Sequence, residues 1–515
     1  MSRCKLTIEM GTNCQIGELR PLFSPEEVRK IEKLAYREGM DEFSLMKLAA
    51  KQVWLQVKKI IKPGEKIIVF AGMGNNGGDG FMTACFASRS GFEVQVRYLG
   101  DLEHQSTNGR RAYQNCLKEK IPVVPFESNE EIRADLFLDA LLGIGFQPPL
   151  RSDIAEAIAF LNQQTKPVIS IDLPSGLDGK TGAIDSRAVK ANLTITFFGL
   201  KLGLLMHEGY NQSGRLQIEK LGLDKEIQEI KKSCKTFLAI PKTEQLLVRP
   251  ETSHKGNFGH VAVIAGPKEM LGAAILSARA ALRAGAGLVT LFAEDSAIGN
   301  INCYYPELIC RSLTLGRLEE SLTEIDVVIL GPGLGQSKAA RRLLKELLLV
   351  QKKTILDADA LNLLAQNELN IPRNSILTPH PKEAARLLAC SVEEIQKDRY
   401  QAARSLSRKY QSILLLKGCK TILADPDDNC FVIANGNPFL ATAGMGDLLA
   451  GIIGAMWAQK NFSPLKAAIF GASIHGDAGD RAAKELKWSL IASDLLNYLV
   501  PLTPPQPDCH DFVKI

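Results

Sequence analysis

Short apolar runs that end in glycine or polar clusters, each followed by a helical pattern, recur through both halves of the chain. The first run, Lys66–Ala71, enters the glycine-rich stretch 72–80, and a helix is expected from Phe81. Strand, loop and helix in this order are typical of a parallel α/β sheet, in which ligand sites lie at the carboxyl ends of the strands. The pattern therefore predicts an α/β fold with its sites at strand ends.

Two such domains are expected, because a chain of 515 residues is too long for one hydrophobic core. The apolar periodicity fades between residues 224 and 242, where charged residues accumulate, and the alternation restarts at His260. We place the boundary near residue 238, which gives domains 23–238 and 239–515.

The start of the chain, residues 1–22, shows no strong period and is expected to form an N-terminal tail. It has no apolar signal core and is not rich in arginine, so we expect a cytoplasmic protein. Ser24, Pro25 and Glu27 then follow the N-cap, N1 and N3 pattern of a helix start.

The composition excludes several classes of partner. Hydrophobic residues make up 45% and charged residues 23% of the chain, and the net charge of +5 is spread without a long basic run. We therefore expect neither nucleic acid binding nor, since no segment approaches about 18 consecutive apolar residues, a membrane span. The 11 cysteines are scattered without a C-x-x-C pair, which indicates free thiols in a reducing compartment.

Three predicted strands in the first half end in polar residues. Each group alone is explained as a helix cap, but three groups at equivalent strand ends favour one shared site. Oxygen ligands without cysteine or histidine suit a hard cation. The residues concerned are Asn75, Asn76 and Asp79 after the first strand, Asp139 after the second, and Asp172 and Ser175 after the third.

Two other features of the first half leave their interpretation open. Gly72, Gly74 and Gly77 formally match G-x-G-x-x-G, but Asp79 places a negative charge where a pyrophosphate would bind, so a dinucleotide loop is weakly supported. Lys201 follows a predicted strand, and a salt-bridged surface lysine and a catalytic lysine are equally good interpretations.

In the second half, four strand ends again carry glycine or polar clusters, at 331–335, 357–360, 378–383 and 417–421. His380 stands between two prolines and cannot lie inside a helix, which predicts an exposed loop position or a simple turn residue. Lys417 and Gly418 lack the spaced leading glycine of a Walker A loop, although they remain able to contact a nucleotide phosphate.

The stretch 435–454 carries the strongest chemical signal. Gly444, Met445 and Gly446 predict a turn at a helix N-terminus, where unpaired N–H groups bind anionic oxygens. Asp447 follows at once; it is either a helix cap or a base that takes a proton from a hydroxyl during phosphoryl transfer. Glycines on both sides favour the second interpretation, since a cap does not need them.

On these motifs both halves resemble the family of bifunctional NAD(P)H-hydrate repair enzymes. The resemblance covers about residues 24–500. It rests on long ordered motifs: A-G-M-G-N-N-G-G-D-G, L-D-A-L-L-G-I-G, I-D-L-P-S-G-L-D and T-F-F-G-L-K-L-G-L, then L-G-A-A-I-L-S-A-R-A-A-L-R-A-G-A-G-L-V-T, L-G-P-G-L-G, D-A-D-A-L, T-P-H-P-K-E, L-K-G and A-G-M-G-D.

The resemblance implies a Rossmann-like α/β/α epimerase domain followed by a ribokinase-like α/β/α dehydratase domain. The epimerase would interconvert the R and S hydrates of NADH and NADPH. The dehydratase would restore NAD(P)H from the S form with ADP, or with ATP as in eukaryotic members. The implied cofactors are K⁺ in the epimerase and Mg²⁺ with the nucleotide, and we expect a homo-oligomer.

The resemblance also implies roles for single residues, with Asp172 and Asp447 as the catalytic groups and Asn76, Asp139 and Ser175 as K⁺ ligands. The implied hydrate contacts of the epimerase are Asn75, Asn76, Gly77, Gly78, Asp79, Gly143, Ile144, Gly145, Phe146, Gln147 and Asp172. Those of the dehydratase are Ala273, Gly333, His380 and Asp447. The implied nucleotide contacts are Lys417, Gly418, Cys419, Lys420, Thr421 and Gly446.

The sequence departs from the family pattern in three places. Ala50 and Lys382 each stand where the family commonly has glycine. The residue at position 50 could therefore change the wall of the epimerase site, and the residue at position 382 could change the turn beside His380. Residues 1–22 have no clear counterpart.

Two alternative hypotheses remain for the function. The chain could be a small-molecule kinase fused to a ligand-binding domain, or its first domain could only bind a nucleotide or a partner.

Overall fold

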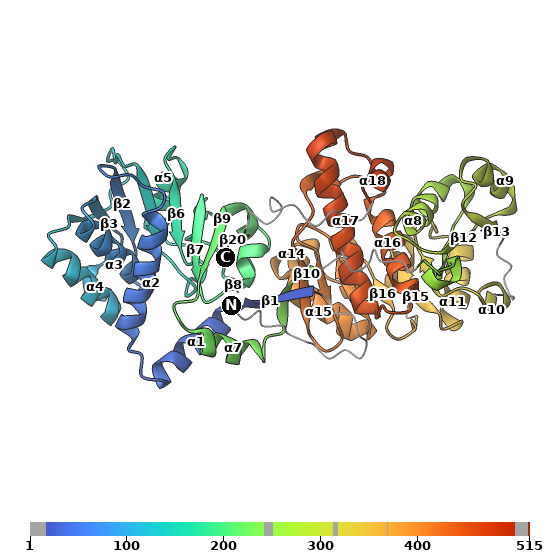
Figure 1. Cartoon of the computed structure of the whole chain (residues 1–515), viewed down its shortest axis with the longest axis horizontal. Helices are drawn as coiled ribbons and strands as arrows, with labels where there is room; N and C mark the ends of the chain where they lie inside the picture. The colour runs from blue at the N-terminus through green and yellow to red at the C-terminus, as the bar shows by residue number, and fades with distance from the viewer. Residues whose placement is uncertain (1–16, 242–250, 313–317, 368, 500–512, 515) are drawn as a thin grey trace. The chain divides into compact units, whose positions relative to one another are not determined.

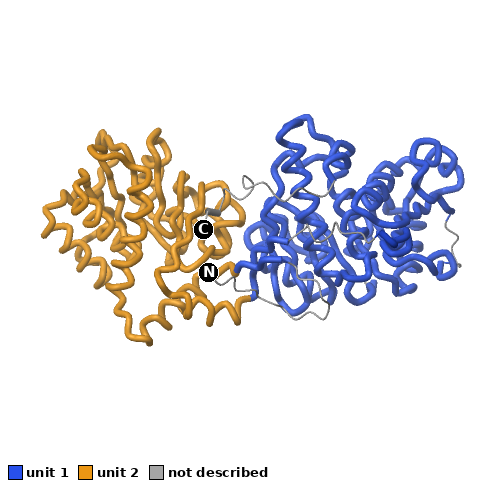
Figure 2. Tube along the Cα trace, viewed as in Figure 1, with its two compact units in different colours: residues 1–20, 235–504 blue, residues 21–234, 505–515 orange. Residues whose placement is uncertain are grey.

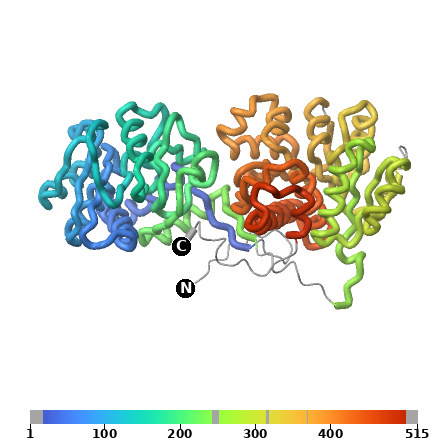
Figure 3. Tube along the Cα trace, turned by 90° about the horizontal axis from the view of Figure 1, so that it is seen from above, coloured from blue at the N-terminus to red at the C-terminus, as the bar shows by residue number. Residues whose placement is uncertain are grey.

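The computed structural model describes residues 17–241, 251–312, 318–367, 369–499 and 513–514 (Figure 1). The chain divides into two compact units, with a boundary between Cys234 and Lys235 (Figure 2). We call residues 21–234 with 513–514 the N-terminal unit, and residues 17–20 with 235–499 the C-terminal unit. Figure 3 shows that the blue-to-green part of the chain gathers in the first and the later part in the second. The predicted bounds 23–238 and 239–515 lie close to this division and stay a prediction.

The N-terminal unit contains an all-parallel sheet in the order β20-β9-β7-β6-β5-β2-β3-β4. The order reverses beside β2, where β3 lies on one side and β5 on the other, and a crevice forms at such a point in an open α/β sheet. The strands are β2 (Lys66–Ala71), β3 (Glu93–Tyr98), β4 (Val123–Pro125), β5 (Leu136–Ala140), β6 (Val168–Ile171), β7 (Leu193–Phe197), β9 (Arg215–Glu219) and β20 (Val513–Lys514).

Helices cover both faces of this sheet. Ile67 and Val69 of β2 pack with residues of α2 and α3, whereas Ile68 and Phe70, which point to the other face, pack with α5. The unit is therefore a three-layer α/β/α domain, as expected. Its helices are α1 (Pro25–Arg37), α2 (Glu42–Val57), α3 (Asn75–Arg89), α4 (Thr107–Lys118), α5 (Ser152–Asn162), α6 (Gly209–Gln212) and α7 (Asp224–Lys231), with short 3₁₀ turns at η1 (Leu102–His104) and η2 (Leu202–Leu205).

Helix α3 begins at Asn75, so the expected start at Phe81 is wrong. The glycines form the first turns of the helix rather than a loop, because these turns approach their neighbours too closely for a side chain. A Cβ on Gly77 would lie 1.8 Å from the Gly72 carbonyl oxygen, and one on Gly78 would lie 2.4 Å from Met46 Cε. Close packing therefore accounts for these two glycines.

Residues 17–22 of the expected N-terminal tail belong to a strand. Gly17–Phe23 form strand β1, whose residues Leu22 and Phe23 pair in parallel with Leu200 and Lys201 of β8. Both Leu22 and Phe23 are fully buried, which the short apolar pattern did not indicate. The remaining part of the expected tail, residues 1–16, lies outside the described residues. The helix start at Ser24 is confirmed, since Ser24 and Glu27 form a complete capping box.

The sheet of the C-terminal unit runs β13-β12-β11-β14-β15-β16-β17-β18-β19-β10 and is parallel except for β18. Four of the strands whose ends were predicted to carry the site, β14 to β17, are neighbours in this order, as a shared site requires. The strands are β10 (Thr236–Pro241), β11 (His260–Ile264), β12 (Leu288–Phe292), β13 (Ile309–Arg311), β14 (Val327–Leu330), β15 (Lys353–Leu356), β16 (Ile376–Leu377), β17 (Ile413–Leu416), β18 (Ile422–Ala424) and β19 (Cys430–Ile433).

Helix α16 (Met445–Ala458) is the buried centre of the C-terminal unit and packs against α8 and α17. A Cβ on Gly451 would lie 2.1 Å from the Ser277 carbonyl oxygen, so glycine allows α8 to come close. The other helices are α8 (Leu271–Arg283), α9 (Asp295–Tyr304), α10 (Leu318–Ser321), α11 (Lys338–Leu349), α12 (Ala358–Gln366), α13 (Pro381–Leu388), α14 (Val392–Lys397), α15 (Arg399–Tyr410), α17 (Pro464–Leu486) and α18 (Ala492–Tyr498). None of the helices in the described residues is both long and apolar enough to span a membrane.

Two candidate active sites

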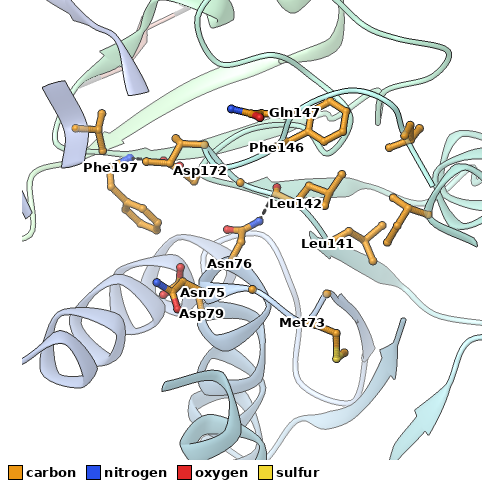
Figure 4. Close-up of a pocket in the computed structure, with 18 of the residues that line it drawn as sticks. Met73, Asn75, Asn76, Asp79, Leu141, Leu142, Phe146, Gln147, Asp172 and Phe197 are labelled. Atoms are coloured by element: carbon orange, nitrogen blue, oxygen red, sulfur yellow. Dashed lines mark hydrogen bonds between the residues drawn. The ribbon is translucent and has the colours of Figure 1, made fainter. Parts of the chain in front are cut away.

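The N-terminal unit contains a cavity of about 600 Å³ at the carboxyl ends of its strands (Figure 4). Nine of the predicted hydrate contacts line it: Asn75, Asn76, Asp79, Gly143, Ile144, Gly145, Phe146, Gln147 and Asp172. The predicted contacts Gly77 and Gly78 are buried within α3 and do not line the cavity. The departure at Ala50 does not reach it either, since Ala50 is buried and absent from the lining.

Asp172 follows β6 and enters the cavity beside Phe197 (Figure 4). Its backbone has a φ of 67°, a left-handed conformation that is strained for aspartate and is concentrated at functional sites. Its Oδ1 atom accepts from Lys201 Nζ and, at 3.3 Å, from the Phe197 amide. Within the described part of the chain, Oδ1 makes all the hydrogen bonds of this carboxylate, so Oδ2 is left for a ligand.

Lys201 is fully buried beneath this carboxylate. Its ammonium group also donates to Thr196 Oγ1 at 2.7 Å and to the Phe197 carbonyl at 2.8 Å. Burial lowers the pKa of Lys201, and the ion pair with Asp172 opposes that shift. The salt bridge of the first interpretation is present, but the lysine lies in the interior and not at the surface. The catalytic interpretation stays a prediction.

Helix α1 supplies a carboxyl group that the sequence analysis missed. Glu32 lines the cavity, and burial together with the nearby charge of Asp172 raises its pKa to about 7. A signal was present, because Glu32 lies one helical turn after the buried Val28 and thus on the same face. Asp79 lies in the same environment, where burial and the charges of Asp172 and Glu32 raise its pKa well above the usual range.

The predicted cation ligands converge on the backbone of Leu142. Asn76 Nδ2 donates to the Leu142 carbonyl at 2.8 Å (Figure 4). The Leu142 amide donates to Ser175 Oγ at 2.8 Å. Ser175 in turn contacts Asp139, which accepts the Ser175 amide at 2.9 Å and Ser170 Oγ at 2.8 Å. Three residues from three strand ends therefore meet at one point.

Asp139 is a suitable anchor for a cation. It is fully buried, burial raises its pKa, and no lysine, arginine or histidine among the described residues pairs with it. The ionised form of a buried carboxylate without a counter-ion is disfavoured, and a bound cation would offset that cost. The oxygen atoms of Asn76, Asp139 and Ser175 are of the type that hard cations prefer.

In the C-terminal unit, Asp447 lies in the first turn of α16, behind the N-cap Gly444 with its φ of 88°. Burial and the charge of Asp357 raise the pKa of Asp447 to about 7, while Lys417 acts in the opposite direction. A carboxyl group that titrates near neutral pH is suited to general base catalysis. The unpaired N–H groups of the same turn are positioned to bind an anion.

Lys417 forms an ion pair with Asp357, 2.7 Å between Nζ and Oδ1, and Thr378 Oγ1 donates to the same oxygen at 2.8 Å. Gly446 lies against this pair, since a Cβ there would be 3.1 Å from Lys417 Nζ. The structure thus brings together the predicted residues Lys417, Gly446 and Asp447, and adds Asp357, which the sequence analysis noted only as part of a polar strand end.

His380 caps helix α13 rather than projecting from a free loop. Its Nδ1 atom accepts from the amides of Lys382 and Glu383 at 3.1 and 3.3 Å, which leaves Nε2 as the proton-bearing nitrogen. Burial lowers the pKa of His380, so the ring is neutral at pH 7. Lys382 lies in the first helical turn, a conformation that any residue adopts, so the missing family glycine does not disturb this cap.

Ala273 and Gly333 are neighbours on another side of this site. Gly333 has a φ of 65°, and a Cβ there would lie 3.4 Å from Ala273 Cβ and 2.2 Å from the Met270 carbonyl oxygen. The loop that carries Gly333 is held by Asp359, which accepts the Gly335 amide at 2.9 Å. Because the charge of Asp359 also acts on Asp447, the two parts of the site are coupled electrostatically.

The predicted nucleotide loop 417–421 connects β17 to β18. Hydrogen bonds from the side chain of Arg399 hold this loop in place. This buried guanidinium donates to the carbonyls of Leu416, Lys417 and Cys419, which no sequence pattern indicated. Lys420 does not extend from the loop, because its ammonium group donates to the Ala434 carbonyl. Cys419 is exposed, so it and the backbone of Gly418 and Thr421 remain the candidate contacts.

Comparison with known proteins gives an independent result. Residues 42–203 match the family model of the YjeF-related protein N-terminus, and residues 261–501 match that of NAD(P)H-hydrate dehydratase. The chain is 38% identical to a bifunctional NAD(P)H-hydrate repair enzyme from Coxiella burnetii, over 94% of this chain and 99% of that protein. It is 37% identical to the corresponding Escherichia coli enzyme, over 91% of both chains.

A solved structure, the ADP/ATP-dependent NAD(P)H-hydrate dehydratase of Bacillus subtilis co-crystallised with ATP/Mg²⁺, is 29% identical and covers 49% of this chain and 91% of its own, with a TM-score of 0.44. The full-length relatives carry the assignment, since they span both units at more than 30% identity. The chain belongs to the family of bifunctional NAD(P)H-hydrate repair enzymes, as the resemblance predicted.

Proposed function

We propose that the C-terminal unit dehydrates the S hydrates of NADH and NADPH with ADP, releasing AMP and phosphate, and that Asp447 is its base. The position of Asp447, with a pKa of about 7 in the first turn of α16, carries this proposal. A base of this pKa accepts a proton at neutral pH and still returns it.

In this mechanism Asp447 takes the proton of the C6 hydroxyl, and the alkoxide oxygen attacks the terminal phosphoryl group of ADP. The new O–P bond forms as the bond to AMP breaks, and the first-turn N–H groups of α16 stabilise the charge on the phosphoryl oxygens. Phosphate then leaves with the C6–O electron pair while a proton leaves the neighbouring carbon, which restores the ring double bond.

Lys417 supports the same step. Its ammonium group lies beside Gly446, where the terminal phosphate of the nucleotide would contact the helix end. The ATP/Mg²⁺ complex of the Bacillus subtilis relative supports nucleotide and Mg²⁺ use. ADP is proposed as the donor over ATP because this chain resembles the fused enzymes, and both nucleotides belong in the test below.

Mg²⁺ fits the donor set of this site. Among the described residues, no three His, Cys, Asp or Glu side chains gather into a metal cluster. Mg²⁺ does not need one, because it is commonly held by one or two carboxylates, water and substrate phosphates. Asp357 and Asp359 at the end of β15 would supply the carboxylates, and the ion would offset phosphate charge.

For the N-terminal unit we propose interconversion of the R and S hydrates in the 600 Å³ cavity, with Asp172 as an acid or base at the C6 hydroxyl. The free Oδ2 atom of Asp172 supports this role. K⁺, held by Asn76, Asp139 and Ser175, would compensate the buried charge of Asp139. Those three residues would then fix the start of α3 against the Leu142 backbone.

The proposed assembly and location rest on the sequence alone. A homo-oligomer and a cytoplasmic location stay predictions, as do the preference between NADH and NADPH hydrates and the bounds of the two domains.

A recovery assay tests the proposal. The purified protein is incubated with NADH hydrate and either ADP or ATP, and the absorbance of reduced nicotinamide is followed. We expect recovery with ADP and release of AMP and free phosphate. A small-molecule kinase would instead leave a phosphorylated product, and no recovery with either nucleotide would refute the dehydratase proposal.

A further inference from the structure

Three carboxyl groups from three different elements line the cavity of the N-terminal unit. Glu32 comes from α1, Asp79 from the start of α3, and Asp172 from the end of β6. Only Asp172 has a buried cation as its direct partner, the ammonium group of Lys201. Binding of a nicotinamide ring does not require three carboxyl groups. At least one of them is therefore available for another role.

We propose that Glu32 is the second proton-transfer group of the epimerase and works together with Asp172 at the C6 hydroxyl of the hydrate. The inference rests on the proposed function of this cavity and assigns it a two-group mechanism. Glu32 lies on the α1 wall and Asp172 at the sheet end, so the two carboxyl groups approach a bound ring from different elements.

Inversion at C6 needs groups of this kind. One carboxyl group donates a proton to the C6 hydroxyl, the C6–O bond breaks with its electron pair on oxygen, and water leaves. The ring nitrogen lone pair stabilises the resulting cation at C6. Water then adds to the other face, and the second carboxylate accepts the proton that this addition releases. One proton has moved between the two groups, and the reverse reaction returns it.

The charges around Glu32 suit this exchange. Burial is the largest cause of its raised pKa, Asp172 and Glu42 raise it further, and Lys201 and Arg29 lower it, so that it lies at about 7. At neutral pH the group is therefore present in both protonation states. Tyr36 and Asp79 also face Glu32, and burial together with the neighbouring carboxyl groups raises the pKa of each.

The packing of α1 allows Glu32 to be replaced without loss of the contacts that anchor the helix. The capping box of Ser24 and Glu27 fixes the start of the helix, and Val28, Ile31 and Ala35 anchor it in the core without Glu32. The substitution Glu32→Gln keeps the shape of the side chain and removes only its ability to carry a proton. Glu26→Gln on the same helix is the matched control, because Glu26 is exposed and does not line the cavity.

The experiment measures interconversion of purified R and S NADH hydrates by the full-length protein, corrected for the uncatalysed rate. We expect Glu32→Gln to lower kcat about 100-fold with a smaller change in KM, and to abolish the inflection of the wild-type pH profile near 7. Glu32→Asp should recover part of kcat, and Glu26→Gln should behave as wild type. The dehydratase activity of the same chain should be unchanged in every variant, which controls for folding and concentration.

Any one of four results would overturn the inference. A Glu32→Gln enzyme within about threefold of wild type in kcat would exclude a proton-transfer role. A raised KM with unchanged kcat in Glu32→Gln would show that Glu32 only binds the substrate. An inflection near pH 7 that persists in this variant would lead to the same conclusion. Interconversion in ¹⁸O-labelled water without label in the product hydroxyl would exclude C6–O cleavage. Absence of interconversion by the wild-type protein would instead refute the proposed function of the cavity itself.

Discussion

Lys417 Nζ lies 2.7 Å from Asp357 Oδ1, and this ion pair lies against Gly446, the residue before Asp447. The two charges act on Asp447 in opposite directions, since Asp357 raises its pKa and Lys417 lowers it. Burial and Asp357 together raise the pKa of the base to about 7, and Lys417 limits that rise. A change in either partner should appear in the pH profile of the dehydratase as well as in its rate.

The substitution Lys417→Met should move the acidic limb of that profile, along which activity rises with pH, to higher pH. Lys417 lowers the pKa of Asp447, so its removal raises the pKa, and a higher pH is then needed to deprotonate the base. We also expect a higher KM for ADP and a loss of stability of about 3–5 kcal/mol, because Asp357 would be left buried without its cation. A pH series of kcat/KM and a urea titration measure these effects.

The double variant Lys417→Met/Asp357→Asn is the control for this prediction. It removes both charges, so it should regain stability, and the acidic limb of its pH profile should return toward that of the wild type. The raised KM for ADP should persist. Lys338→Met, at an exposed position of α11, should change neither quantity. An unshifted limb in the single variant would show that Lys417 does not set the pKa of Asp447.

Gly77→Ala should destabilise the N-terminal unit. A Cβ at this position would lie 1.8 Å from the Gly72 carbonyl oxygen, so the start of α3 must move away from the strand end that precedes it. Overpacking of this kind costs about 1–3 kcal/mol, and it should also lower the epimerase rate by displacing Asn76 and Asp79.

Gly74→Ala is the matched control for stability, since a Cβ on Gly74 would meet nothing within 4 Å. Thermal unfolding of the two variants, followed together with the epimerase rate, compares them directly. Equal unfolding temperatures would mean that close packing is not the reason for the glycine at position 77.

K⁺ should stabilise the N-terminal unit and support epimerisation, because it would compensate the buried carboxylate of Asp139. We expect the unfolding temperature to rise when tetramethylammonium chloride is replaced by potassium chloride at equal ionic strength. Asp139→Asn should remove this response, while Asp135→Asn, whose carboxylate is paired with Lys166 at the surface, should retain it. A wild-type protein that shows no difference between the two salts would contradict the K⁺ assignment.

The sequence predicted the elements that have a strong local signal. The apolar run Lys66–Ala71 forms a strand with the expected bounds, and the capping pattern at Ser24 marks a real helix start. The start of α3 was misplaced, because the glycines that normally indicate a loop serve here for close packing with Gly72 and Met46. Tertiary contacts of this kind leave no trace in local composition.

The same limit applies to the sites. Asp172 and Asp447 follow strands or glycine turns, so their position in the sequence indicates their role. Glu32 lies in the middle of an amphipathic helix, and Arg399 supports its loop through carbonyl groups, so neither has a motif. Their functions depend on which elements the fold places next to them, and only the structure provides that information.

The central claim, that Asp447 activates the C6 hydroxyl toward a nucleotide phosphate, is tested most directly by Asp447→Asn. The measurement is the recovery of reduced nicotinamide from NADH hydrate with ADP, with the epimerase rate of the same chain as the control. The account predicts a loss of about 10²–10⁴-fold in kcat with epimerisation unchanged. An Asp447→Asn protein that repairs the hydrate at the wild-type rate would contradict it.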